Sequence, residues 1–241
     1  MSLFVLDISH WQGPDVNLQT AKEAGCRAVY IKATEGINPN PDQHFLHNVA
    51  KAKAAGLQWG AYHFFKWAPQ YDPLQQAQVF YRLLSGQTGL GQLRPAFDIE
   101  LSPRETGVDS TERVAWRVHQ LLTEFERLSG IKATIYTSFT QWERMVVWRN
   151  PKKLWARDWP SRAKEHPLWV ADYEAFKTWK DNRGIEHTNA PRLPRGWTRW
   201  DLCQYSGSGT FPGFKTKVDL NRPNDDPDAN GRDGLDRIKI G

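Results

Sequence analysis

Short apolar runs that alternate with helical stretches restrict the fold of this chain more than any other feature of its sequence. Five such runs, typical of β-strands, occur up to Ser138, and the segments between them carry helical periodicity, helix caps or helix-ending glycines. A repeated strand–helix order is typical of a parallel α/β barrel or a doubly wound sheet. The expected strands cover residues 3–9, 28–34, 59–65, 94–101 and 133–138.

Four helices are expected between these strands. The first covers residues 17–24, the second carries an apolar stripe over residues 45–53, and the third begins with Asp72 as N-cap and Pro73 as the first helical residue. The longest helix covers residues 109–129, with Asp109 and Glu112 as a capping box and Gly130 as its end.

The chain changes character after the fifth strand. Strands are expected at residues 168–173, 199–206 and 218–221, but the segments that join them are rich in Pro, Gly, Arg and Asn. About a dozen residues separate the last two strands, and a parallel crossover with its own helix needs at least that many. We therefore predict a modified TIM-type α/β barrel, with five β/α units followed by three strands that have few helices and some antiparallel pairing.

Two carboxylates two residues apart, Asp98 and Glu100, lie in the fourth expected strand. A strand directs alternate side chains to the same face, so their Cα atoms would lie roughly 6–7 Å apart. Two acids at that distance repel each other, which keeps one protonated while the other is ionised. Cleavage of a glycosidic bond needs such a pair. The simpler interpretation of an isolated pair is one surface acid and one acid paired with an arginine.

Polar side chains recur near the carboxyl ends of all eight expected strands. Active sites of barrels lie at this end, and charged groups on apolar strands are costly to desolvate, so a shared depth favours a common site. The residues in question are Asp7, Thr34, Glu35, Tyr62, His63, Asp98, Glu100, Tyr136, Thr137, Asp172, Tyr173, Gln204, Tyr205, Asp219 and Asn221.

Composition narrows the class of protein. The 241 residues, 39% of them hydrophobic, fit one domain of barrel size, and the absence of an apolar run of 18 residues predicts no membrane insertion. A net charge of +5 favours polyanionic partners such as nucleic acid, anionic lipid or bacterial cell wall. The chain has only Cys26 and Cys203, both in apolar segments, which predicts two reduced, buried thiols. The seven His residues lack metal-ligand spacing, so we expect neither a metal nor a cofactor.

The ordered set of motifs resembles the family-25 glycoside hydrolases, muramidases (lysozymes) of bacteria, fungi and bacteriophage endolysins. The resemblance covers residues 3–222. It rests on the segments DISHWQG (7–13), YIKATEG (30–36), GAYHF (60–64), FDIE (97–100), IYT (135–137), LWVADY (168–173), CQYS (203–206) and VDLN (218–221).

This resemblance implies hydrolysis of the β-1,4 bond between N-acetylmuramic acid and N-acetylglucosamine in peptidoglycan, with net retention. Glu100 would be the general acid and then the general base, and Asp98 the second carboxylate. Asp7 and Asp219 would orient and tune that pair. Either Asp98 attacks the anomeric carbon, or it assists the substrate's own 2-acetamido group, and the second route is favoured because the substrate carries that group.

Six further residues are expected to contact substrate. The resemblance gives Tyr62 as a substrate-side hydroxyl, and we add Glu35, Tyr136, Trp169, Asp172 and Gln204. Each has an alternative. Glu35 could cap a loop or pair with Lys32, Asp172 and Gln204 could satisfy polar groups of the rim, and the aromatic residues could belong to the core.

The remaining expectations concern organisation and partners. Residues 1–222 would form the catalytic barrel, and residues 223–241 a mobile tail with no separate wall-binding module. The stretch 226–231 resembles half of an EF-hand loop, but Arg237 stands where a bidentate Glu is needed. We expect a monomer whose partner is the peptidoglycan glycan strand. The N-terminus reads as a strand rather than a signal peptide, which favours release by a phage holin or a secretion apparatus.

Two rival functions come from other classes. One is a non-catalytic barrel that binds cell wall or another carbohydrate, against which the intact pair of Asp98 and Glu100 argues. The other is a nucleic-acid binder, suggested by charge alone and opposed by the lack of a recognition helix or an RNA-binding motif.

Overall fold

A closed eight-stranded barrel forms the body of the protein. The computed structural model describes residues 4–100, 111–145, 162–180 and 183–240. Around the barrel the strands follow the order β1, β10, β9, β6, β5, β4, β3 and β2. Their bounds are β1 (Phe4–Ile8), β2 (Cys26–Glu35), β3 (Gln58–Phe64), β4 (Ala96–Asp98), β5 (Thr134–Ser138), β6 (Leu168–Ala171), β9 (Leu202–Gly209) and β10 (Val218–Pro223).

Seven of these strands run parallel, and β10 runs antiparallel to both of its neighbours, β1 and β9. The segment between β9 and β10, residues 210–217, carries no helix. A short connection of this kind can only return the chain in the opposite direction. The predicted modified barrel with antiparallel pairing near its end is confirmed.

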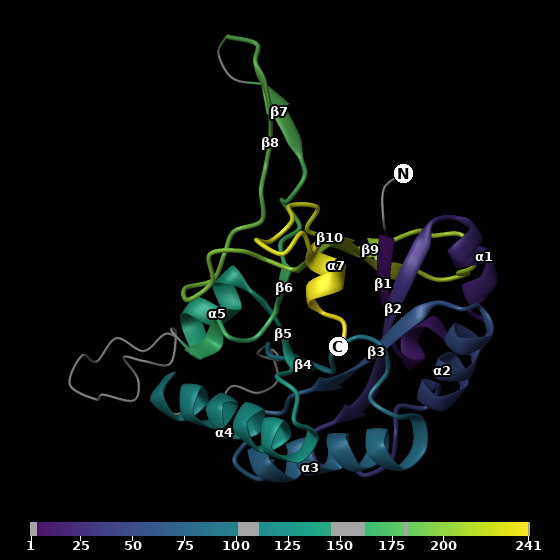
Figure 1. Cartoon of the computed structure of the whole chain (residues 1–241), viewed down its shortest axis with the longest axis vertical. Helices are drawn as coiled ribbons and strands as arrows, with labels where there is room; N and C mark the ends of the chain where they lie inside the picture. Colours follow the sequence, from purple (N-terminus) through teal and green to yellow (C-terminus); the bar gives the residue numbers. More distant parts are fainter. Residues whose placement is uncertain (1–3, 101–110, 146–161, 181–182, 241) are drawn as a thin grey trace.

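A helix follows each of the first five strands, as the sequence pattern predicts (Figure 1). Asp72 accepts bonds from the amides of Leu74 and Gln75, which fixes the start of the third helix at Pro73. The proposed capping box of Asp109 and Glu112 lies outside the described residues. The helices are α1 (Leu18–Glu23), α2 (Phe45–Ala54), α3 (Pro73–Leu83), α4 (Thr111–Ser129) and α5 (Phe139–Met145).

Two layers of apolar side chains hold the fold together. The outer layer lies between strands and helices, where Phe80 of α3 stacks on Phe125 of α4 with ring centroids 5.4 Å apart. The inner layer fills the barrel and includes Tyr30 stacked on Trp169 at 4.6 Å. Gly60 leaves space for this stack, because a Cβ there would lie 2.6 Å from Tyr30. The filled interior supports the polar side chains at the carboxyl ends of the strands.

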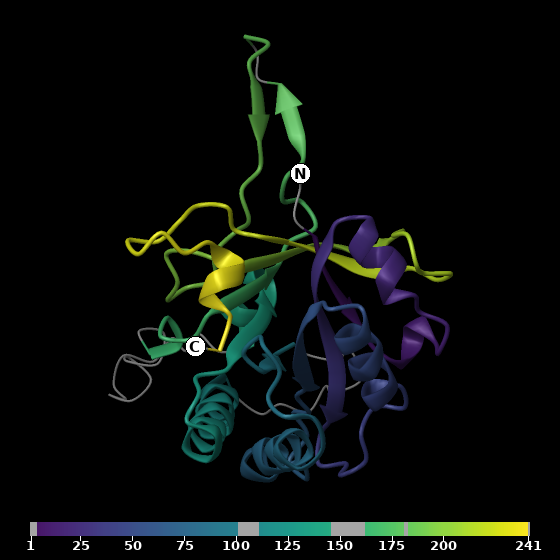
Figure 2. The ribbon, with the colours of Figure 1, turned by 45° about the vertical axis from the view of Figure 1, so that its right-hand side comes forward.

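The structure departs from the expected elements in two places. β4 ends at Asp98, so Glu100 lies just beyond the strand rather than within it. A two-stranded hairpin, β7 (Thr178–Lys180) and β8 (Glu186–Thr188), follows β6 and projects away from the barrel (Figures 1 and 2). The segment that contains it reads as an Arg- and Lys-rich loop in the sequence, because its strands are too short and exposed to show an apolar alternation.

The end of the chain, expected to be a mobile tail, is packed against the amino-terminal end of the barrel. Leu235 in α7 (Gly234–Arg237) and Ile238 directly after the helix are buried in the inner layer. The Arg94 amide donates to the Ile238 carbonyl at 2.7 Å, and the Arg237 guanidinium forms a buried ion pair with Asp201. In the sequence, Leu235 and Ile238 are the two apolar residues of this packing, and they stand among polar neighbours. This pattern is too weak to predict a packed segment.

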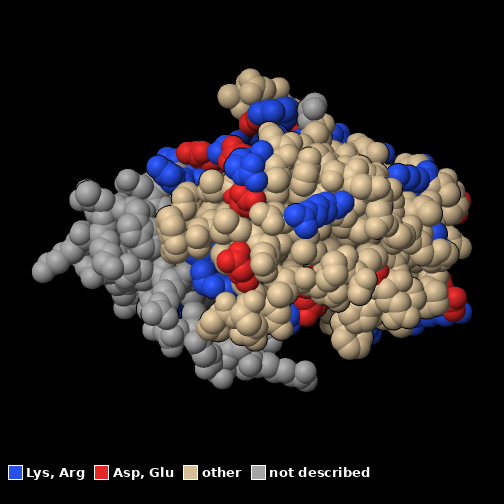
Figure 3. Space-filling model, turned by 90° about the horizontal axis from the view of Figure 1, so that it is seen from below, with Lys and Arg blue, Asp and Glu red and all other residues tan. Residues whose placement is uncertain are grey.

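The two cysteines agree with the expectation from composition. Cys26 and Cys203 are buried free thiols, and burial raises the pKa of each to about 12. Among the described residues, none of the helices is both long and apolar enough to cross a membrane. On the face seen from below, basic side chains are separated by acidic and uncharged surface (Figure 3).

Candidate active site

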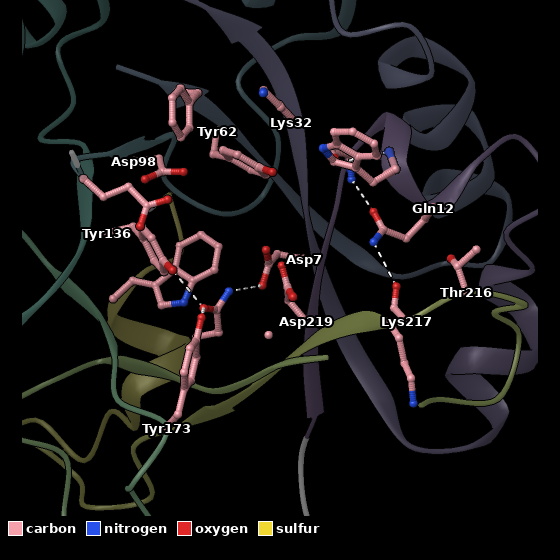
Figure 4. A pocket seen from close by; sticks show the side chains of 17 residues that line it. Asp7, Gln12, Lys32, Tyr62, Asp98, Tyr136, Tyr173, Thr216, Lys217 and Asp219 are labelled. Carbon is pink, nitrogen blue, oxygen red and sulfur yellow. Dashed lines mark hydrogen bonds between the residues drawn. The ribbon is translucent and has the colours of Figure 1, made fainter. Parts of the chain in front are cut away.

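A cleft of about 550 Å³ opens at the carboxyl ends of the parallel strands. All four acids expected to be catalytic line it, and so do four of the six expected substrate contacts. Side chains from strands far apart in the sequence meet there (Figure 4). The lining consists of Asp7, Ser9, Trp11, Gln12, Lys32, Tyr62, Phe64, Asp98, Glu100, Tyr136, Trp169, Tyr173, Gln204, Gly207, Thr216, Lys217 and Asp219.

Asp98 and Glu100 form the first acid pair. Asp98 is buried at the end of β4, and burial and the Glu100 carboxylate raise its pKa well above the ordinary value, with Lys32 acting the other way. Burial and the charge of Asp219 raise the pKa of Glu100. The Oδ1 atom of Asp98 has no hydrogen-bond partner among the described residues. Both groups therefore bind a proton more readily than free carboxylates do.

Asp7 and Asp219 form the second acid pair, opposite each other on the antiparallel strands β1 and β10. Oδ2 of Asp7 accepts bonds from Asn221 at 2.7 Å and from Gln204 at 3.2 Å. Burial, followed by the charge of Asp219, raises the pKa of Asp7 well above its ordinary value. Burial raises the pKa of Asp219, while the bond from Asp7 lowers it. Both carboxyls therefore bind a proton more readily than free aspartates do.

A chain of hydrogen bonds fixes the amides that contact Asp7. Trp169 donates its indole N–H to Oδ1 of Asn221 at 2.7 Å, which leaves the Asn221 amino group to face Asp7. The hydroxyls of Tyr136 and Tyr173 donate to Oε1 of Gln204 at 2.8 and 3.0 Å, with the same effect on Gln204. Of the predicted contacts, Tyr136, Trp169 and Gln204 therefore also orient the acid pair.

The phenols of the cleft stay neutral. Burial and the charges of Asp7 and Asp98 raise the pKa of Tyr62 well above its ordinary value. Burial and Glu100 do the same for Tyr136, and the pKa of Tyr173 rises to about 12. These hydroxyls keep their protons at any pH at which the acids titrate, so Tyr136 and Tyr173 continue to donate to Gln204.

Two of the predicted substrate contacts lie outside this cleft. Glu35 lines a neighbouring hollow and forms ion pairs with Lys32 at 2.6 Å and Lys66 at 2.8 Å. The carboxylate of Asp172 is buried against Arg192, to which it is bonded at 2.9 Å through both the backbone amide and the guanidinium. Asp172 therefore fixes the chain after β6. This matches the alternative interpretation, in which Asp172 satisfies polar groups at the rim of the barrel.

Several residues of the site were not among the predicted contacts. Tyr173 and Asn221 belong to the polar ring at the strand ends, so a signal for them was present. Trp11 and Gln12 lie in the short 3₁₀ helix η1 (His10–Gln12), in which Ser9 and Gln12 form a capping box. Gln12 also donates to the carbonyl of Lys217 at 3.0 Å, and the Trp11 side chain is 76% exposed at the mouth of the cleft.

The donor set of the cleft favours proton transfer over metal binding. Within the part of the chain that the structure describes, no three His, Cys, Asp or Glu side chains group as a metal site requires. The arrangement instead offers two neighbouring acid pairs whose carboxyls all have raised pKa values. It can protonate a leaving oxygen and stabilise an adjacent positive charge.

Comparison with known proteins identifies the family. The family model described as "Glycosyl hydrolases family 25" matches residues 6–214. Lysozyme M1 of Streptomyces globisporus is 30% identical over 223 residues, which cover 91% of this chain and 67% of the relative. The N,O-diacetylmuramidase of Chalaropsis is 28% identical, with 85% and 91% covered.

Solved structures agree with this result. The bacterial lysozyme from Streptomyces coelicolor superposes with a TM-score of 0.70 at 28% identity, covering 93% of both chains. The spore cortex lytic enzyme SleM of Clostridium perfringens shares the fold, with a TM-score of 0.74 at 24% identity over 93% of this chain and 68% of that one. With four acids in one cleft and a family match over most of its length, the chain belongs to the family-25 glycosyl hydrolases.

Proposed function

We propose that this protein is an N-acetylmuramidase that hydrolyses the β-1,4 bond between N-acetylmuramic acid and N-acetylglucosamine of peptidoglycan, with net retention at the anomeric carbon. The observation that carries the proposal is the joint presence of Asp98 and Glu100 on one cleft in a member of this glycosidase family. The relatives named lysozyme and diacetylmuramidase support the same bond as the target.

In the first step, Glu100 is the general acid and protonates the glycosidic oxygen as the glucosamine leaves. Burial and Asp219 raise its pKa, which keeps the carboxyl protonated at a higher pH than a free glutamate. As the glycosidic C–O bond breaks, the carbonyl oxygen of the muramic 2-acetamido group bonds to the anomeric carbon and forms an oxazolinium ring.

Asp98 accepts the hydrogen bond of the acetamido N–H during this step. Its raised pKa makes it a better acceptor, and the substrate N–H supplies a donor to a carboxylate that has an unpaired oxygen among the described residues. The Glu100 carboxylate then takes a proton from water. The resulting hydroxide attacks the anomeric carbon from the face that the leaving group occupied, the ring opens and the acetamide is restored.

Purified peptidoglycan digested by the protein, reduced with borohydride and analysed by mass spectrometry tests the bond that is cut. Reduced muramic acid at the new ends is expected, and reduced glucosamine would contradict the proposal. Glu100→Gln should lower the rate by at least about 10²-fold, because it removes the proton donor at nearly constant volume. Glu126→Gln, at an exposed ion pair on α4, is the matched control and should retain the rate.

The same assay separates the rival interpretations. A non-catalytic wall-binding barrel would bind peptidoglycan and release no fragments. Peptidoglycan with de-N-acetylated muramic acid distinguishes the two retaining routes. Its cleavage should be lost if the acetamido group attacks and kept if Asp98 attacks directly.

A further inference from the structure

A second hollow, of about 600 Å³, adjoins the catalytic cleft on the side of β2 and β3. We call it the rim hollow; its walls include His10, Lys32, Glu35, Asp42, Lys66 and Tyr71. None of the four acids of the catalytic cleft lines it. The rim hollow is thus lined by a different set of side chains from the acid pairs of the cleft.

The rim hollow and the cleft meet at two points. Lys32 lines both, and in Figure 4 it lies on the opposite side of Tyr62 and Asp98 from Tyr173. The ring of His10, in the rim hollow, packs at 4.8 Å from the ring of Trp11, which borders the cleft. A ligand can therefore occupy the cleft and extend past Lys32 into the rim hollow.

Two lysines and two acids share the walls of the rim hollow with the amides Asn38, Asn40 and Gln43. The ammonium groups of Lys32 and Lys66 both contact the Glu35 carboxylate, and both lie about 5 Å from the centroid of the Phe64 ring, at 4.9 and 5.1 Å. All three side chains line the hollow, with Glu35 41%, Lys66 23% and Lys32 11% exposed, so a ligand there borders both ammonium groups. His10 and Asp42 add a contact of 2.6 Å on the other wall.

We propose that the rim hollow binds the peptide stem of muramic acid, with Lys32 and Lys66 contacting a stem carboxylate beside Glu35. This inference rests on the proposed function, which places muramic acid in the adjoining cleft. The stem branches from the sugar through a lactyl group and must leave the cleft on one side. Ammonium groups held by a partly exposed carboxylate suit an anionic ligand.

Two substrates test the proposal: glycan strands that carry their stems, and the same strands freed of stems by an amidase. The readout is the ratio of kcat/KM for the first to kcat/KM for the second. Wild type should prefer the stem-bearing strands. Lys66→Met should lower the ratio about threefold to fivefold, the size expected for one partly exposed ionic contact, and Lys66→Arg should restore it.

Glu35→Gln gives the opposite sign. It removes the resident carboxylate that competes for the two lysines, so the ratio should rise, and added salt should reduce the gain. The matched control is Lys132→Met. Lys132 is likewise ion-paired, with Glu126 and Glu165, but it lies outside the cleft and the rim hollow. Its ratio should equal that of wild type.

Three results would overturn the inference: a wild-type ratio of one, an equal loss on both substrates in Lys66→Met, or a fall of the ratio in both Lys66→Met and Glu35→Gln. If neither substrate is cut, the proposed function fails instead. Binding of a synthetic alanyl-γ-glutamyl-lysine peptide, measured by calorimetry, then tests the rim hollow without catalysis. Saturable binding weakened by Lys66→Met supports the inference, and no saturable binding refutes it.

Discussion

Asn221 donates from Nδ2 to Oδ2 of Asp7 at 2.7 Å, and this bond decides which oxygen of Asp7 can hold a proton. Since Gln204 donates to the same oxygen, a proton on Asp7 is favoured on Oδ1 instead. The amide of Asn221 is itself oriented by the indole of Trp169. An uncharged residue thus controls the charge state of an acid pair.

Replacing Asn221 should therefore shift the pH dependence of activity. In Asn221→Leu the anionic form of the Asp7–Asp219 pair loses a donor, so the pair takes up its second proton at a higher pH. Glu100 then sees less negative charge, and its pKa falls. The alkaline limb of the pH–rate profile should move to lower pH.

Stability is the second readout for this variant. Asn221→Leu should lose about 1–3 kcal/mol, because the buried indole N–H of Trp169 is left without its acceptor. Trp169→Phe removes the N–H that orients the Asn221 amide, so it should move the alkaline limb in the same direction by a smaller amount. An unmoved limb in Asn221→Leu would show that Asn221 does not tune the acids.

The acid cluster should make the protein less stable as the pH rises. Asp7, Asp98, Glu100 and Asp219 all have raised pKa values in the folded state, so between the ordinary values near 4 and the raised ones the folded state binds more protons than the unfolded state. By linkage, the free energy of unfolding falls as the pH rises through this range.

Thermal melts across this pH range would measure the effect, and Glu100→Gln should flatten the decline and raise Tm near neutral pH. A matched melt of Glu126→Gln should follow wild type, since Glu126 lies outside the cleft whose acids create the slope. A Tm that rises steadily toward neutral pH in wild type would argue that the four acids are stabilised as anions.

The ion pair of Asp201 and Arg237 is expected to hold the end of the chain against the barrel. Both side chains are buried, and Asp201 also accepts from the Leu168 amide at 2.8 Å. Arg237→Met should cost about 3–5 kcal/mol, because the aspartate is left buried without its partner. Arg232→Met, at the more exposed pair with Asp228, should cost at most about 1 kcal/mol. Urea unfolding of both variants measures the difference.

The sequence predicted those parts of the molecule in which a local pattern and the final environment agree. Asp72 and Pro73 mark the start of α3 as expected, and the acids at the strand ends meet in one cleft. The sequence did not predict which residues become partners only when the barrel closes. Glu35 faces Lys66 across two strands, and Asp172 faces Arg192, twenty residues further along the chain. Strand register places a side chain at a rim but does not say which cation it meets there.

Gly60 tests whether the inner layer of the barrel positions the site. A Cβ at this position would lie 2.6 Å from Cε1 of Tyr30 and 2.9 Å from Cβ of Leu93, both of which are fixed in the packed interior. Gly60→Ala should cost about 1–3 kcal/mol through overpacking. It should also lower kcat, because Tyr30 stacks on Trp169, which orients Asn221 and through it Asp7.

Gly86→Ala, where the added Cβ meets nothing within 4 Å, is the control and should leave stability and kcat near wild type. Loss of stability in Gly60→Ala with an unchanged kcat would mean that the stack supports the fold alone and not the acids above it.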